Sequence, residues 1–455
     1  MKVRNFSLSF ILFSFAKYYK TQTQETTQML QKLFGFDPAK TTVRTEIMSG
    51  LTTFMTMAYI LAVNPNILSD AGMDKGALFT TTALISGAAT LLMALYAKLP
   101  YALAPGMGLN AFYAYTVCLI MGYTWQFAIT AVFIEGITFI LLTASNLRDK
   151  MVMALPDTVK RAISAGIGIY IAFIGMQQAK IVVNSDATLV TLGDITQGPA
   201  LLAFIGLIIT SVLLIFRVKG ALMFGILATT IIGIPMGITQ YQGIFNLPPS
   251  VEPIFFKFEW DKIFTFDMVI VVFTFLFVDL FDTIGTLLGV SQDSDIIDNK
   301  DPKGLKKAFM VDAIGTTAGA IMGTSTVTTL VESAAGVKEG GRSGLTAFTT
   351  AICFFIALLL SPIFLAIPPS ATAPVLVLVG LMMTAAVVKI DFNDYLEAVP
   401  AFVCIVFMPL TYSISEGIIW GHISYVLLCL LTGHYKRLRL GMYILAVFFL
   451  TKYLM

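Results

Sequence analysis

Long apolar stretches alternate with short polar ones along almost the whole chain, and they fall into two sets of seven. Membrane-spanning helices need about 20 predominantly apolar residues. The pattern therefore predicts an all-α polytopic membrane protein with 14 transmembrane segments. The first set covers 46–66, 77–98, 101–121, 124–144, 158–181, 199–216 and 220–238. The second set covers 264–290, 306–322, 326–338, 343–361, 371–388, 393–412 and 415–433.

Composition supports the membrane class and excludes a soluble one. The chain is 57% hydrophobic and 12% charged, with a mean hydropathy of +0.84, whereas soluble domains carry about 25% charged residues. The net charge is only +2, so nucleic acid is not an expected partner. The cysteines lie in apolar runs and their spacing fits no metal site; neither a metal nor a cofactor is expected. They are Cys118, Cys353, Cys404 and Cys429.

The distribution of Lys and Arg sets the expected orientation. With the N-terminus in the cytoplasm, most of these residues fall in cytoplasmic tails and loops, as the positive-inside rule requires. Seven spans in the first set make the two halves inverted repeats, 45–238 and 264–433, joined by a loop at 239–263. We expect a multi-pass protein of the plasma (inner) membrane with a cytoplasmic N-terminal tail, 1–44, and a cytoplasmic C-terminal tail, 434–455.

Both tails contain an additional apolar stretch. Met29 offers an alternative start, which makes residues 1–28 a candidate non-native extension. Leu438–Leu454 is a surplus apolar segment that could lie at the membrane interface or form a fifteenth span. Both interpretations of this C-terminal segment remain open at this point.

Two interrupted helices occupy corresponding places in the two halves. Pro100–Phe112 reads PYALAPGMGLNAF and Gly323–Gly336 reads GTSTVTTLVESAAG. Pro, Gly and runs of Ser/Thr disfavour a full-length helix, so we expect two half-helices, each preceded by a short extended segment. Such a pair is typical of the binding site of a secondary transporter. Asn110 and Glu332 follow the two interruptions and are candidate substrate contacts.

A third element places carboxylates within an apolar helix. Asp279 and Asp282 lie near the middle of the eighth segment, three residues apart and so on one helix face. An ionisable group at the bilayer centre costs about 2.5–3.5 kcal/mol, so such groups face the protein interior. Two neighbouring carboxylates resist double ionisation, and this pair is therefore a candidate for proton coupling. Asp312, early in the ninth segment, is a further coupling candidate.

Each candidate also has a purely structural interpretation. The two aspartates could form a hydrogen-bonding pair, and Asn110 or Glu332 could cap broken backbone. Phe112 would by default pack against lipid or in the core, but its place beside Asn110 makes it a candidate platform for an aromatic ligand. Glu135 lies in the middle of the fourth span, where we expect it to serve a packing interface rather than the substrate.

The polar groups of these elements suit a planar, neutral, nitrogen-rich ring. Carboxylates accept hydrogen bonds from ring and exocyclic N–H groups, and an asparagine amide both donates and accepts. The three elements carry no Lys or Arg, which argues against an anionic substrate.

Three of these stretches resemble the AzgA-like branch of the nucleobase–cation symporter-2 (xanthine/uracil permease) family. They are Ala104–Phe112 (APGMGLNAF), Phe277–Leu287 (FVDLFDTIGTL) and Gly323–Val337 (GTSTVTTLVESAAGV). Thr52–Ile60 (TTFMTMAYI) and Pro409–Ile414 (PLTYSI) are similar to further helices of that family. The motifs occur in order over most of the chain.

The resemblance implies a proton-coupled importer of purine nucleobases, namely adenine, guanine or hypoxanthine, and not an enzyme. It also implies a uracil-permease-like fold with a core domain of segments 1–4 and 8–11, a gate domain of segments 5–7 and 12–14, and a homodimer. The expected substrate-binding residues are Asn110, Phe112, Asp279 and Glu332. The expected proton-coupling residues are Asp282, Asp279 and Asp312.

Three rival functions have some basis in the sequence. An intramembrane enzyme could bind a divalent metal at Asp279 and Asp282, but no further carboxylates or phosphate-binding residues accompany them. A channel would need a ring of equivalent groups, whereas this site is asymmetric. An anion exchanger of similar fold is disfavoured by the buried acids. The preferred purine and the proton stoichiometry are not determined by the sequence.

Overall fold

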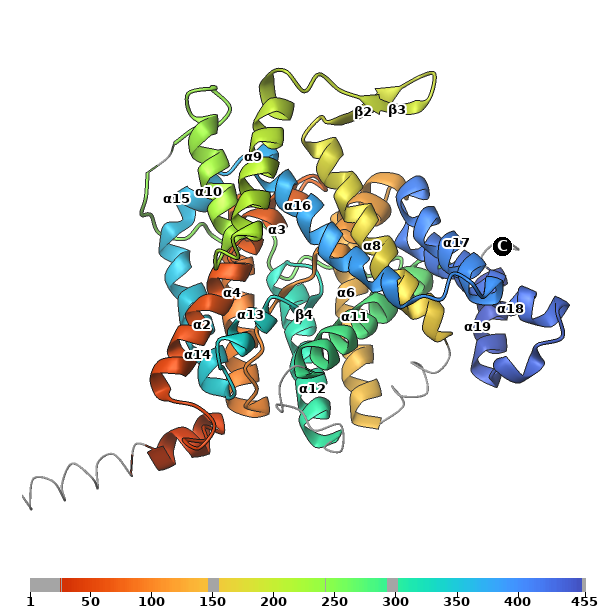
Figure 1. Cartoon of the computed structure of the whole chain (residues 1–455), viewed down its shortest axis with the longest axis horizontal. Coiled ribbons are helices and arrows are strands. Elements are labelled where there is room, and N and C mark those ends of the chain that lie inside the picture. The colour runs from red at the N-terminus through yellow and green to blue at the C-terminus, as the bar shows by residue number, and fades with distance from the viewer. Residues whose placement is uncertain (1–24, 26, 146–154, 242, 293–301, 452–455) are drawn as a thin grey trace, which may run out of the picture.

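Helices form almost all of the regular structure (Figure 1). The computed structural model describes residues 25, 27–145, 155–241, 243–292 and 302–451. The candidate extension at 1–28 lies almost entirely outside the described residues. The helices of the first half are α2 (Val43–Met57), α3 (Ile60–Ser69), α4 (Lys75–Leu92), α5 (Met107–Ala111), α6 (Trp125–Ser145), α8 (Asp157–Gln178), α9 (Gly198–Ile215) and α10 (Ala221–Gly233).

The second half repeats this helical character. Its helices are α11 (Phe266–Gln292), α12 (Pro302–Met322), α13 (Ser333–Lys338), α14 (Gly344–Ala357), α15 (Ser361–Leu365), α16 (Pro369–Thr384), α17 (Tyr395–Thr411), α18 (Ile414–Leu431) and α19 (Leu440–Thr451). Short 3-10 or π-helical turns extend several of them, among them η1 (Met93–Ala97) after α4 and η2 (Phe112–Ile120) after α5.

The structure confirms a helical, polytopic membrane protein. Each of the 14 predicted segments contains a helix. Within the described residues, eight helical stretches are long and apolar enough to cross a membrane. They are Val43–Ser69, Lys75–Ala97, Trp125–Ser145, Asp157–Gln178, Gly198–Ile215, Gly344–Leu365, Pro369–Lys389 and Ile414–Leu431. The full count of 14 spans in inverted repeats stays a prediction.

Two short strands from opposite halves of the chain pair at the centre of the fold. β1 (Leu103–Pro105) is antiparallel to β4 (Val327–Thr329), with Ala104 opposite Thr328. We call this pair of strands the crossing. α5 and η2 follow β1, and α13 follows β4, as expected for two half-helices preceded by extended segments. All six strand residues are buried, so the crossing satisfies interrupted backbone away from lipid.

Helices from the two halves pack together in two groups. α6 lies against α12, and α14 lies against α2 and α4. In the other group α8 packs on α16 and α17, and α9 packs on α10 and α16. The β2–β3 hairpin (Val182–Ser185 and Leu189–Leu192) follows α8 and projects at the end of the molecule opposite the start of α2 (Figure 1).

The C-terminal apolar segment forms α19, which has 12 residues. At 1.5 Å per residue it is about 18 Å long, well short of the ~30 Å hydrocarbon core. It packs on α18, and its Phe448 and Phe449 rings each lie 5.4 Å from the ring of Phe273 in α11. The described part of this segment is therefore too short for a fifteenth straight span.

Candidate functional site

The polar run before and within β4 contacts five surrounding helices. Its residues are β-branched or small, which favours extended backbone, and successive side chains of an extended segment point to opposite sides. Each hydroxyl in turn meets a polar side chain of another element. The pairs are Thr324 with Asn64 of α3, Ser325 with Asn110 of α5, Thr326 with Glu135 of α6, Thr328 with Thr283 of α11, and Thr329 with Asp312 of α12.

The crossing needs close approach of its two chains. Gly106 follows β1 and donates its backbone N–H to the carbonyl of Thr326 at 3.1 Å. A Cβ atom on Gly106 would lie 2.8 Å from Cγ2 of Thr328 and 3.9 Å from Oδ2 of Asp282. Glycine at this position therefore lets β1 lie against β4 directly beside an acidic side chain of α11.

Asn110 is completely buried in α5. Its Oδ1 accepts a hydrogen bond from the Ser325 hydroxyl. Its Nδ2 has no partner among the described residues. A buried amide N–H₂ without an acceptor costs free energy, so this donor is available to a ligand carbonyl or ring nitrogen. The structure thus places the predicted residue with a free donor at the crossing.

Glu332 lies immediately before α13 but does not cap it, since its side chain accepts no backbone N–H of that helix. The Tyr59 hydroxyl, between α2 and α3, donates to Oε1. Oε2 is buried and has no partner in the described part of the chain. The capping interpretation is therefore wrong, and one carboxylate oxygen is free to accept.

Asp279 is fully buried in α11, and neither of its carboxyl oxygens receives a hydrogen bond from the described residues. Its charged neighbours are Glu135 and Asp282. An isolated ionised carboxylate is very costly in a medium of low dielectric constant. Asp279 must therefore hold a proton, share one with a neighbouring acid, or receive donors from a ligand.

The remaining predicted residues differ in their surroundings. Asp282 is only partly buried, and Glu332 is the charged group that acts on it. Asp312 is fully buried and accepts from Thr283 at 2.7 Å and from Thr329 at 3.5 Å. Asp312 thus holds α11, α12 and β4 together and offers less to a ligand than Asp279 does.

Phe112 begins η2, one turn after the start of α5, and is fully buried. Its ring meets Phe275 of α11 edge-on, with centroids 5.0 Å apart and an interplanar angle of 73°. This contact fixes α5 and η2 against the helix that carries Asp279.

Sequence reasoning assigned Glu135 to a packing interface, and the structure places it at the crossing instead. Oε2 accepts from the Thr326 hydroxyl at 2.7 Å, while Oε1 has no partner among the described residues. The neighbouring Gly136 does serve the interface, because a Cβ atom there would lie 2.8 Å from the backbone nitrogen of Thr317 in α12. A carboxylate in the middle of a span was itself a signal that this side chain faces polar partners inside the protein.

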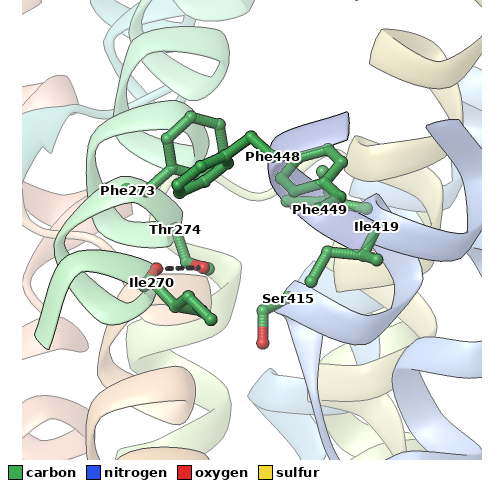
Figure 2. A pocket seen from close by; sticks show the side chains of 8 residues that line it. Ile270, Phe273, Thr274, Ser415, Ile419, Phe448 and Phe449 are labelled. Atoms are coloured by element: carbon green, nitrogen blue, oxygen red, sulfur yellow. Dashed lines mark hydrogen bonds between the residues drawn. The ribbon is translucent and has the colours of Figure 1, made fainter. Parts of the chain in front are cut away.

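Two other features bear on ligands. Among the described residues, no group of three His, Cys, Asp or Glu side chains is arranged to hold a metal ion. A pocket lies between α11, α18 and α19 (Figure 2). Its lining is apolar apart from Thr274 and Ser415, and both hydroxyls have internal partners, the Ile270 carbonyl and Ser413. This pocket lacks the free polar groups of the crossing.

Comparisons with known proteins give consistent results. The family model Xan_ur_permease, described as "Permease family", matches residues 44–419. The chain is 41% identical to guanine/hypoxanthine permease PbuG of Bacillus subtilis (strain 168), covering 92% of this chain and 98% of that protein. It is 38% identical to adenine permease AdeQ of Escherichia coli (strain K12), covering 93% of this chain and 96% of that protein.

A solved structure shares the fold. The transmembrane domain of the cyanobacterial bicarbonate transporter BicA superposes with a TM-score of 0.62 at 16% identity, covering 83% of this chain and 97% of that domain. At this identity the likeness concerns the fold alone, which is that of a membrane transporter.

Proposed function

Since the chain belongs to this permease family, it is a membrane transport protein and not an enzyme, and we propose that it imports purine nucleobases together with protons. The transported purines would be guanine and hypoxanthine, adenine, or all three. The names of its relatives support purine transport. The proton is proposed on the basis of the acids at the crossing.

The observation that carries the proposal is a set of buried polar atoms without partners. Asn110 offers an amide donor, and Glu332 and Asp279 offer carboxylate acceptors. A purine nucleobase presents complementary groups on its edges, with ring N–H donors beside carbonyl and ring-nitrogen acceptors. Phe112 would border the ring as part of an aromatic wall. Asp282, Asp279 and Asp312 would adjust protonation during transport.

Transport by the purified protein in proteoliposomes tests this proposal. An inward proton gradient should drive accumulation of radiolabelled hypoxanthine, and an uncoupler should abolish that accumulation. Unlabelled adenine and guanine, added in competition, would define the preferred purine. Accumulation that ignores the proton gradient and follows sodium would contradict proton coupling, and saturable uptake of none of the three purines would contradict the substrate class.

We further propose 14 spans in two inverted repeats, with the core domain (segments 1–4 and 8–11) moving against the gate domain (segments 5–7 and 12–14). The packing of α6 on α12 and of α8 on α16 supports this division. Every proposed site residue then belongs to the core, so the site can travel as a unit. Two gate domains in a homodimer would supply a fixed frame, with both termini in the cytoplasm.

A designed disulfide tests the motion. A Cβ atom on Gly108 of α5 would lie 3.9 Å from Cβ of Ile167 in α8, within the ~3.5–4.5 Å separation of disulfides. In a background without the four native cysteines, the pair Gly108→Cys and Ile167→Cys should block uptake when oxidised and restore it on reduction. The single variants are the controls. Full uptake with complete cross-linking would rule out this motion.

A further inference from the structure

Glu135 is a buried acid at the crossing that the proposed site residues do not include. It projects from α6, outside the helix that carries Asp279 and Asp282. Its side chain is 0% exposed, as is that of Asp279. The two carboxyl groups lie within hydrogen-bonding reach of each other. Glu135, a titratable group without a role in the proposed function, therefore faces Asp279, the acid that we assign to purine contact.

Hydrogen bonding around this pair is incomplete in a specific way. Thr326 donates to Oε2 of Glu135 at 2.7 Å, which orients the carboxyl group. Within the described residues, no donor reaches Oε1 of Glu135 or either oxygen of Asp279. Ionised carboxylates only accept hydrogen bonds, so two facing carboxylates can bond only if one of them carries a proton.

Among the described residues, the charged neighbours of this pair are all acids. The charged groups that act on it are Asp282 from α11 and Asp312 from α12, and both are acids. The neighbouring groups of β4 are hydroxyls, Thr326 and Thr328. With like charges on each side and no cation among these neighbours, double ionisation of the pair is strongly opposed.

We propose that Glu135 and Asp279 share the coupling proton, so that Glu135 carries this proton while purine occupies the oxygens of Asp279. This inference deepens the proposed function and rests on it. In the empty protein open to the outside, one proton bridges the two carboxyl groups. When a purine ring N–H donates to Asp279, the proton remains on Glu135 and stabilises the loaded site. Release of purine into the cytoplasm lets the proton leave as well, so one proton accompanies each purine.

The proposal makes purine affinity depend on pH in a defined direction. Binding requires one proton on the pair, so affinity is full when the pair is singly protonated. It falls as the pH rises through the loss of that proton, by up to about tenfold per pH unit. Glu135→Gln replaces the proton carrier with an amide that donates permanently to Asp279. This variant should bind purine with an affinity that no longer changes with pH.

The test is equilibrium binding by the purified full-length protein, using whichever of hypoxanthine, guanine and adenine the unmodified protein binds most tightly. Affinity is measured from acidic to alkaline buffer. The unmodified protein should show a slope, that is, an affinity that falls as the pH rises. The control variant Glu339→Gln, which removes a carboxyl group in an ion pair with Lys219, should show the same slope. Glu135→Gln should lose this slope. Glu135→Asp, which keeps a carboxyl group, should retain it with its midpoint at a different pH. Glu135→Gln should also stop accumulation against a gradient while retaining purine exchange.

The outcomes separate this inference from the function on which it rests. A Glu135→Gln variant that keeps the slope overturns the role of Glu135. So does loss of affinity at every pH in both Glu135→Gln and Glu135→Asp, because that indicates a structural acid. Purine binding without any slope in the unmodified protein overturns the shared proton but leaves purine transport intact. Absence of purine binding in the folded, unmodified protein overturns the proposed function itself.

Discussion

Glu46 and Asp279 are both fully buried acids, but their surroundings are opposite. Glu46 of α2 lies beneath the start of α14 and accepts hydrogen bonds on both carboxylate oxygens. The donors are the backbone N–H groups of Arg342, Ser343 and Thr346, at 3.0, 3.4 and 3.2 Å, and the Thr346 hydroxyl at 2.5 Å. Asp279 receives no hydrogen bond from the described residues.

This difference separates a carboxylate whose oxygens are supplied with donors by the fold from one whose oxygens are left without them. An intramolecular hydrogen bond contributes about 0.5–1.5 kcal/mol net, so the donors at the start of α14 hold the Glu46 side chain in place and join two distant parts of the chain. Asp279 has no such support, and its oxygens remain available to a proton or a ligand. Burial alone does not distinguish the two roles, whereas the supply of donors does.

The largest effect is expected at Glu46. Glu46→Ala leaves several buried donors at the start of α14 without an acceptor. Each unsatisfied donor costs about 1–3 kcal/mol, so the free energy of unfolding should fall by more than about 3 kcal/mol. Purine affinity of the molecules that remain folded should be unchanged. Denaturant unfolding and ligand binding measure the two quantities. Glu46→Gln, which keeps one acceptor oxygen, should lose less stability. A Glu46→Ala protein with an unchanged free energy of unfolding would show that Glu46 does not stabilise the fold.

Glu332 should show the reverse pattern. Glu332→Ala removes a carboxylate that accepts a hydrogen bond from the ligand. This loss costs roughly 1.5–3 kcal/mol of binding free energy, or about 10–150-fold in affinity. Stability should change little, because only Tyr59 donates to this side chain within the described residues. Isothermal titration with purine and a melting curve test both statements. Unchanged affinity in the purified variant would make Glu332 a structural residue.

Asp279 and Asp282 should divide the work between them. Asp279→Asn should weaken purine binding without loss of stability, since its carboxylate has no donors to lose. Asp282→Asn should retain binding and flatten the pH dependence of uptake, because Asp282 does not contact the purine but its charge acts on Asp279 and opposes ionisation of the Glu135–Asp279 pair. Binding and uptake are measured on the same preparations. Equal losses of affinity with an unaltered pH profile would show that this division is wrong.

The smallest effect is expected at a partly exposed carboxylate that already has donors. Asp394 precedes α17, accepts from the backbone of Leu396 at 3.0 Å and pairs with Arg437 at 2.9 Å. Arg437 lowers the pKa of Asp394. The stabilisation is therefore present above the unfolded pKa of about 4 and disappears as the pH falls through the lower folded value. Asp394→Asn should lower the melting temperature slightly at neutral pH, and this difference should vanish in strong acid.

Most residues of the candidate site could be selected from the sequence because they violate the local rules of a membrane segment. Pro105 and the hydroxyl run before Glu332 interrupt helices, and Asp279 places a charge in an apolar run. Each anomaly is visible in a short window of sequence. The position of Glu135 was equally anomalous, but no neighbouring residue in its own helix revealed its partners. Those partners, Thr326 and Asp279, lie far away in the chain.

The sequence by itself determined the membrane class, the helical segments and the two interruptions, because hydrophobicity and backbone preference act over a few residues. Only the tertiary structure decided which acids have donors. Glu46 and Glu135 are both acids on membrane helices, yet one lies under the N-terminus of α14 and the other faces Asp279. That distinction depends on contacts between distant segments, and a donor is supplied or withheld by the fold rather than by the neighbouring residues in the chain.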